Sequence, residues 1–259
     1  MVSSMTFQPT TLLLAMSFYI LGANYVPPCA SPQYVKFGGV GVLHCTFSDE
    51  FFGIFWYDTT DYINSFSIVN LKGSSKSGSG FLSGEFDVHL NGSLIIANVS
   101  LQHDRQFTVL KFNSPSDDPK PCYIQVIVVV NPVPAFPVVD GCNQEEICEL
   151  NLESEGKLNC SVLGVRPRVS LGWRTANERS SAYITFGEEQ TNIINHGNTF
   201  DVFLTSNYRI IDFSLKRIIL ECVVTGVNKE LFQLKTEVSI AFTSCKCNIC
   251  GSGVRFLIC

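Results

Sequence analysis

Eleven cysteines are the residues of this 259-residue sequence that offer the most chemistry. Thiolates bind metals, act as nucleophiles or pair as disulfides, and spacing and redox compartment decide which of these occurs. Most of the cysteines stand singly in strand-like runs, as Cys160 does in LNCSV and Cys222 does in IILECVV. Thiols spread in this way predict disulfides formed in an oxidising compartment.

A second cysteine pattern occupies residues 244–259, which form a cysteine-rich tail. Its spacing is C-x-C-x2-C-x8-C, made by Cys245, Cys247, Cys250 and Cys259. This spacing differs from the regular zinc-finger patterns, and an oxidising compartment disfavours zinc thiolates. Disulfides within the tail or to another chain are therefore favoured over zinc. A truncated or mis-spliced end, in place of a lost membrane anchor, stays an alternative.

The four histidines form no catalytic pattern. They are His44, His89, His103 and His196, and none stands in an HExxH or nucleophile-elbow setting. His103 and Asp104 are the one adjacent pair that could do acid–base chemistry, but their position at a turn between strands favours a structural aspartate. The sequence therefore predicts no enzyme, no cofactor and no metal site.

Residues 12–21 (LLLAMSFYIL) are an apolar run of signal-peptide length, followed by the small residues Gly22 and Ala23. Residues 1–23 are therefore expected to be a signal peptide. No later run reaches the ~20 apolar residues that a membrane-spanning helix needs. The chain as given should be secreted, with a cell-surface protein as the alternative. Its net charge of -5 is spread out and predicts no nucleic-acid or anionic-membrane partner.

Two parts of the chain repeat one pattern. Cys160 and Trp173 lie on two strand-like runs joined by a loop, and Cys45 and Trp56 repeat this arrangement at slightly tighter spacing. Between the two copies, residues 130–142 (VNPVPAFPVVDGC) carry prolines that exclude a helix or a central strand. We therefore expect two domains joined by a stiff, extended connector.

Local patterns add two expectations for the first copy. In FDVHLNGSLIIANV, alternating apolar residues flank Asn91-Gly92, which predicts a hairpin with a type I′ turn in which both turn residues have positive φ. Residues 71–80 (LKGSSKSGSG) are rich in glycine and serine and predict a flexible surface loop.

The order Cys160, Trp173, Cys222 resembles the immunoglobulin superfamily, in which two cysteines bridge the sheets of a sandwich and a tryptophan packs on the bridge. The resemblance implies an all-β fold: two tandem immunoglobulin-like antiparallel β-sandwiches after a signal peptide. Residues 24–131 would be variable-like and residues 132–243 constant-like or intermediate. It also implies a Cys160–Cys222 disulfide and makes Trp56 and Trp173 core residues.

The first copy departs from the family pattern. Val109 and Leu110 stand where the second cysteine is expected, so Cys45 lacks its regular partner. Cys29 and Cys122 precede the segments that would be the first and last strands. We predict that they pair and leave Cys45 a buried free thiol, with a Cys45–Cys122 bridge as the rival.

The second copy carries a further pair of cysteines and a departure of its own. Cys142 and Cys148 are expected to close a small local loop. Leu220 replaces the family's tyrosine two residues before Cys222.

The resemblance implies a non-catalytic extracellular protein that recognises or adheres to a protein or glycan ligand through its N-terminal domain. The family's binding face maps onto residues 51–55 and 113–121, with the aromatic candidates Phe51, Phe52, Phe55 and Tyr57. A second copy of the chain, held by homophilic or disulfide-linked contacts, is a further partner. The alternative is the ectodomain of a single-pass immune-type receptor whose membrane segment is missing from the sequence.

Three acceptor sequons for N-glycosylation occur, at Asn91, Asn98 and Asn159. The first lies in the expected hairpin turn and should be exposed. The second lies near the end of the following strand, and the third is expected to point away from the face of Cys160.

Overall fold

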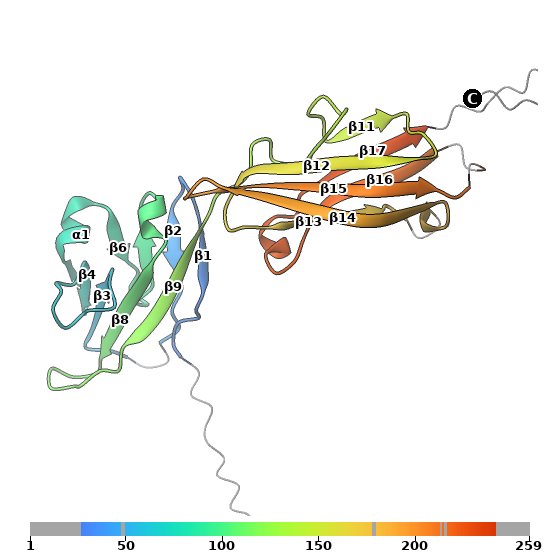
Figure 1. Cartoon of the computed structure of the whole chain (residues 1–259). Helices are drawn as coiled ribbons and strands as arrows, with labels where there is room; N and C mark the ends of the chain where they lie inside the picture. Colours follow the sequence, from blue (N-terminus) through green and yellow to red (C-terminus); the bar gives the residue numbers. More distant parts are fainter. Residues whose placement is uncertain (1–26, 48–49, 178–179, 213, 215–216, 242–259) are drawn as a thin grey trace, which may run out of the picture.

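The computed structural model describes residues 27–47, 50–177, 180–212, 214 and 217–241. Figure 1 shows two bodies of strands that meet end to end, the first blue to green and the second yellow to red. The expected signal peptide (1–23) and cysteine-rich tail (244–259) lie outside the described residues. Among the residues described, no helix is long and apolar enough to cross a membrane.

The N-terminal body is a sandwich of two sheets. The larger has the order β1-β9-β8-β3-β4-β5, with the strands Gln33–Lys36, Cys122–Val129, Gln106–Phe112, Gly53–Tyr57, Val69–Lys72 and Ser75–Ser77. The smaller has the order β2-β7-β6, with the strands Gly41–Leu43, Leu94–Ile96 and Phe86–Val88. Two short helices complete it, α1 (Ser79–Ser83) and η1 (Leu101–His103). Two strands added beyond β3 give the larger sheet the order of a variable-type immunoglobulin domain.

The core of this sandwich follows from period-two alternation. In β3, Ile54 and Trp56 point inward and are fully buried, whereas Phe55 and Tyr57 point outward and are half-buried. Successive strand side chains face opposite sides, so one strand supplies both the core and the outer surface. The same alternation holds in β8, where Phe107 and the residue two beyond it enter the core.

The C-terminal body is a second sandwich, of two four-stranded sheets. One has the order β10-β12-β15-β14, with the strands Val138–Val139, Glu155–Val165, Phe200–Ile210 and Ile184–Asn195. The other has the order β11-β17-β16-β13, with the strands Ile147–Leu150, Lys235–Ala241, Arg217–Thr225 and Ser170–Thr175. The short helices η2 (Ser180–Ala182) and η3 (Lys229–Leu231) lie in its loops. This is the constant-type arrangement, with β11 added parallel to β17.

The expected fold of two tandem immunoglobulin-like sandwiches is confirmed. One buried apolar cluster extends from Cys29 to Val128, and a second from Val129 to Ile240. In the second cluster the disulfide Cys160–Cys222 joins β12 of one sheet to β16 of the other, as expected.

Two local expectations for the N-terminal sandwich are wrong. Residues 71–80 are not a loop, because they complete the β4–β5 hairpin and begin α1; Lys76 is held there by an ion pair to Asp87 at 2.8 Å. The β6–β7 hairpin exists, but its turn is not type I′. Only Gly92 has a positive φ, and its N–H donates to the His89 carbonyl, so the turn is centred on Leu90 and Asn91.

Candidate functional site

The outer face of the larger N-terminal sheet carries a cluster of apolar and aromatic side chains. Register pairs Phe55 with Leu110 of β8, and Tyr57 with Thr108, which in turn pairs with Tyr123 of β9. We call Phe55, Tyr57, Leu110, Phe112 and Tyr123 the outer-face cluster. Leu110 is covered by its neighbours with 5% exposure, whereas Tyr123 is 42% exposed.

Ring contacts fix the geometry of the outer-face cluster. The Phe55 and Phe112 rings meet edge to face with centroids 5.0 Å apart, and the Lys72 ammonium lies 5.4 Å from the Phe55 centroid. Tyr57 packs 6.0 Å from Tyr62, which lies in the loop between β3 and β4. Burial, and then the neighbouring Tyr62, raise the pKa of the Tyr57 hydroxyl, so it stays a neutral hydrogen-bond donor.

The four aromatic candidates taken from the sequence fall into three different environments. Phe55 and Tyr57 lie in the outer-face cluster. Phe51 turns toward the core and packs on Phe47 with ring centroids 6.1 Å apart, while Phe52 is 43% exposed just before β3. Phe112 and Tyr123 are not among the candidates taken from the sequence. The alternation in QFTVLKF and CYIQVIVV is the signal that places these two side chains on the outer face.

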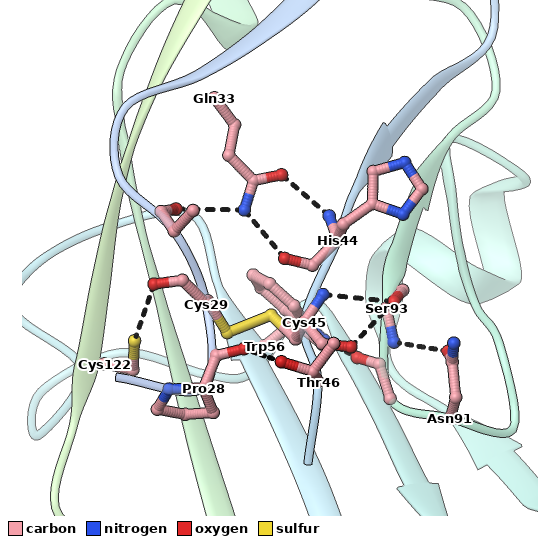
Figure 2. Close-up of a disulfide and its surroundings, with 12 residues drawn as sticks. Pro28, Cys29, Gln33, His44, Cys45, Thr46, Trp56, Asn91, Ser93 and Cys122 are labelled. Carbon is pink, nitrogen blue, oxygen red and sulfur yellow. Dashed lines mark hydrogen bonds between the residues drawn. A yellow bond between two sulfur atoms is a disulfide. The ribbon is translucent and has the colours of Figure 1, made fainter. Parts of the chain in front are cut away.

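The cysteine pairing predicted for the N-terminal sandwich is wrong. Cys29 is joined to Cys45, so Cys45 is not a free thiol and neither Cys29 nor Cys45 bonds to Cys122. Among the described residues Cys122 is the free cysteine, and it is half-buried. Figure 2 shows its thiol directed at the Cys29 carbonyl, with 3.9 Å between the sulfur and oxygen atoms.

The path of the chain before β1 explains the difference. Cys29 stands four residues before Gln33, just as Cys122 stands four before Val126, the β9 partner of Gln33. Cys29 therefore lies beside Cys122 of one sheet, yet it also forms an antiparallel bridge to Cys45, with Cα atoms 4.3 Å apart. The segment before β1 thus contacts both sheets, whereas the predicted Cys29–Cys122 pair requires contact with the larger sheet alone. Burial raises the pKa of the Cys122 thiol and so disfavours its reactive thiolate.

The β6–β7 turn supports both Trp56 and the disulfide (Figure 2). The Trp56 Nε1–H donates to the Gly92 carbonyl at 2.9 Å, and the Cys45 N–H donates to the Ser93 hydroxyl at 3.2 Å. The Asn91 Oδ1 accepts from the Ser93 N–H at 3.0 Å and closes the turn. Two buried polar groups of the core are thereby satisfied by one turn.

His103 and Asp104 do not act as a pair. The buried His103 ring accepts from the Ser100 N–H through Nδ1 and lies 3.1 Å from the Glu85 carboxylate through Nε2. Asp104 points elsewhere, and its Oδ2 accepts from the Val128 N–H at 2.9 Å. Each residue thus has its own structural partners, as the position at a strand-to-strand turn indicated.

The three sequons occupy different settings. Asn91 and Asn98 are exposed, the first in the β6–β7 turn and the second just after β7. Asn159 is half-buried on β12, where its Nδ2 donates to Asp140 at 2.9 Å and its Oδ1 is buried. Asn91 and Asn98 thus lie at the β2-β7-β6 sheet, opposite the outer-face cluster, and Asn159 lies on the second sandwich.

The C-terminal sandwich contains the expected local disulfide Cys142–Cys148 and an ion-pair ladder. Arg174 of β13 and Lys235 of β17 both contact the buried Glu221 carboxylate of β16, at 2.7 and 2.8 Å. Burial alone would raise the pKa of Glu221, but hydrogen bonds from Lys235 and Arg174 outweigh it and lower the pKa. The charged carboxylate is therefore the form that the folded sheet prefers.

This ladder predicts a pH dependence. The folded pKa of Glu221 lies below its ordinary value of 4.5, so its stabilising contribution is complete above pH 4.5 and is lost as pH falls through the folded pKa. Glu221→Gln should lower stability at neutral pH and flatten its decline between about pH 5 and pH 3. Urea unfolding across that range tests this, and equal slopes for native chain and variant would contradict it.

No protein-family model and no curated protein matches the sequence. Among solved structures, the chain is similar to the extracellular portion of mouse CD200RLa, at 14% identity and TM-score 0.48, over 82% of this chain and 99% of that one. It is also similar to bovine butyrophilin, at 16% identity and TM-score 0.48, over 83% and 96%. Murine CEACAM1b matches at 14% identity and TM-score 0.45, over 82% and 96%.

These likenesses are remote, and the fold assignment rests on this chain's own strand order and disulfides. The three disulfides found among the described residues indicate folding in an oxidising compartment, which fits an extracellular or surface location. Within the described part of the chain, no group of three or more His, Cys, Asp or Glu residues could hold a metal ion.

Proposed function

We propose that this chain is a secreted, non-catalytic recognition protein that binds an extracellular protein or glycan through the outer-face cluster of its N-terminal sandwich. The observation that carries the proposal is the cluster itself: aromatic rings from three adjacent strands gathered on one face, with Lys72 beside them. Tyr123 is its exposed edge. Aromatic side chains give a large contact area at small cost in side-chain entropy, which makes them common anchors of interfaces.

The distribution of acceptor sequons supports the same face. Asn91 and Asn98 flank the β2-β7-β6 sheet, and Asn159 lies on the second sandwich. Glycans at Asn91 and Asn98 would shield the β2-β7-β6 sheet, and none of the three positions lies on the outer-face cluster. The loop of residues 113–121 follows Phe112 directly, between β8 and β9, and offers polar groups for the rim.

The proposal is tested by displaying the folded chain on beads and probing panels of extracellular proteins and glycans, with a second copy of the chain included. Tyr123→Ala is expected to reduce binding about tenfold or more, because an exposed aromatic anchor is lost without disturbing the core. Leu90→Ala is the matched control, since Leu90 is also a large exposed side chain, 68% exposed in the β6–β7 turn on the other sheet.

The protein and glycan panels separate the two partner classes. Binding that survives Tyr123→Ala and falls with Leu90→Ala would place the contact surface on the β2-β7-β6 sheet and contradict the proposal.

A further inference from the structure

The two sandwiches are joined by more than the connecting chain. Val130, which follows β9, forms an isolated antiparallel bridge with Arg166, which follows β12 of the second sandwich. The Val130 N–H donates to the Arg166 carbonyl at 2.8 Å, and the Arg166 N–H donates back to the Val130 carbonyl at 3.1 Å. Next to this bridge, Val129 of β9 packs into the core cluster of the second sandwich. Figure 1 shows the end of β9 meeting β12 and β15 at this junction. We call the junction at Val129, Val130 and Arg166 the elbow.

The side chain of Arg166 contacts both sandwiches at the elbow. Its Nε–H donates to Oδ2 of Asp104 in the first sandwich at 2.8 Å, and its Nη1–H donates to the Asn198 carbonyl in the β14–β15 turn at 2.9 Å. The Asp104 oxygen that it contacts is also the acceptor for the Val128 N–H. One guanidinium therefore ties three segments together: the turn before β8, the end of β9 and the tip of the β14–β15 hairpin.

Burial separates this ion pair from ordinary surface pairs. The Arg166 and Asp104 side chains are 22% and 14% exposed, so solvent screens them less than the fully exposed pairs that contribute little. The β14–β15 tip is itself fixed, because Asp201 accepts from the Gly164 N–H at 2.7 Å and pairs with His196 at 2.8 Å. Arg166 thus connects Asp104 of the first sandwich to the β14–β15 turn of the second, and hydrogen bonds already hold both in place. A link between two fixed groups can fix the angle between the sandwiches.

We propose that Arg166 locks this elbow, so that the two sandwiches move as one rigid body and the outer-face cluster is presented at a fixed angle to the second sandwich. Interfaces between domains of one chain generally allow relative motion unless they are large and apolar. Here the backbone bridge and the arginine restrict rotation about the connector. The rigidity expected from the prolines of residues 130–142 then depends on a side chain outside that connector.

Residual dipolar couplings of the weakly aligned, isotope-labelled chain test the lock. In the native chain a single alignment tensor should fit the backbone couplings of both sandwiches. Arg166→Ala is expected to require two tensors, with the alignment magnitudes of the two sandwiches becoming unequal. Arg168→Ala is the matched control, because Arg168 stands two residues along the same loop with an exposed side chain, and a single tensor should still fit.

Asp104→Asn tests the lock from the other sandwich. It keeps an acceptor for the Val128 N–H and removes the charge that Arg166 contacts, and it should also require two tensors. The Asp104→Asn variant therefore tests the proposal even if the Arg166→Ala chain does not fold. A single tensor of native orientation for a folded Arg166→Ala chain, or for Asp104→Asn in its place, would overturn the proposal. The binding assay of Tyr123→Ala is independent of this result, so either proposal can fail alone.

Discussion

Replacing Cys160 and Cys222 together by alanine is expected to lower the free energy of unfolding of the C-terminal sandwich by about 4 kcal/mol. The bridge spans a sequence separation of 62 residues, and cutting it releases a long loop in the unfolded chain. In the folded chain it also joins the two sheets beside Trp173, which pairs in register with Cys222. A loss of this size is a large share of the 5–15 kcal/mol that typically stabilises a domain.

Urea unfolding followed by amide NMR measures this loss, because it reports each sandwich separately. The matched control is Cys142→Ala with Cys148→Ala, whose bridge spans a separation of only 6 residues and should contribute about 2 kcal/mol. The N-terminal sandwich should unfold unchanged in both variants. If the Cys160 and Cys222 variant were no less stable than this control, the bridge would not hold the two sheets together as its position indicates.

The cysteines also show where sequence reasoning works and where it stops. Cys160 and Cys222 could be paired because their order with Trp173 resembles the immunoglobulin superfamily, and that resemblance implies the bridge; each of the two cysteines lies in a long strand. Cys29 could not, because its partner depends on a crossing between sheets that leaves no periodic signal. Cys29 contacts both Cys45 and Cys122, and only the tertiary path of the chain fixes these contacts.

The outer-face cluster was half predictable for a related reason. Alternation alone places Phe55 and Tyr57 on the outer side of β3, which the structure bears out. Which residues of other strands come to lie beside them depends on register, and register is set by pairing across the whole sheet. Phe112 and Lys72 reach Phe55 only because β8 and β4 flank β3.

For residues 71–80, the local composition predicts the wrong structure. Glycine and serine favour a loop, but the β4–β5 pairing and the Lys76–Asp87 ion pair order the segment as an edge strand and a short helix. Gly78 at φ 116° lies so close to the Ile68 carbonyl that a side chain there would collide with the backbone. Some of the glycine that suggested disorder is therefore required by close packing.

Trp56→Ala is expected to lower the free energy of unfolding of the N-terminal sandwich by about 4 kcal/mol, because it removes one of the largest fully buried side chains. Trp56→Phe separates packing from hydrogen bonding. It keeps a ring in the core but leaves the Gly92 carbonyl, which accepts from the indole at 2.9 Å, without its donor. This should cost about 1–3 kcal/mol in addition to the cost of the lost ring volume.

Trp173→Phe supplies the comparison that isolates this hydrogen bond. Trp173 is also buried, but its Nε1 has no hydrogen-bond partner among the described residues, so its replacement by phenylalanine removes ring volume together with a polar atom that was unpaired. Trp56→Phe should therefore destabilise its own sandwich more than Trp173→Phe destabilises the other, as measured by the same urea titration. Equal losses would mean that the bond from Trp56 to the β6–β7 turn adds nothing to stability, and that ring volume alone accounts for both.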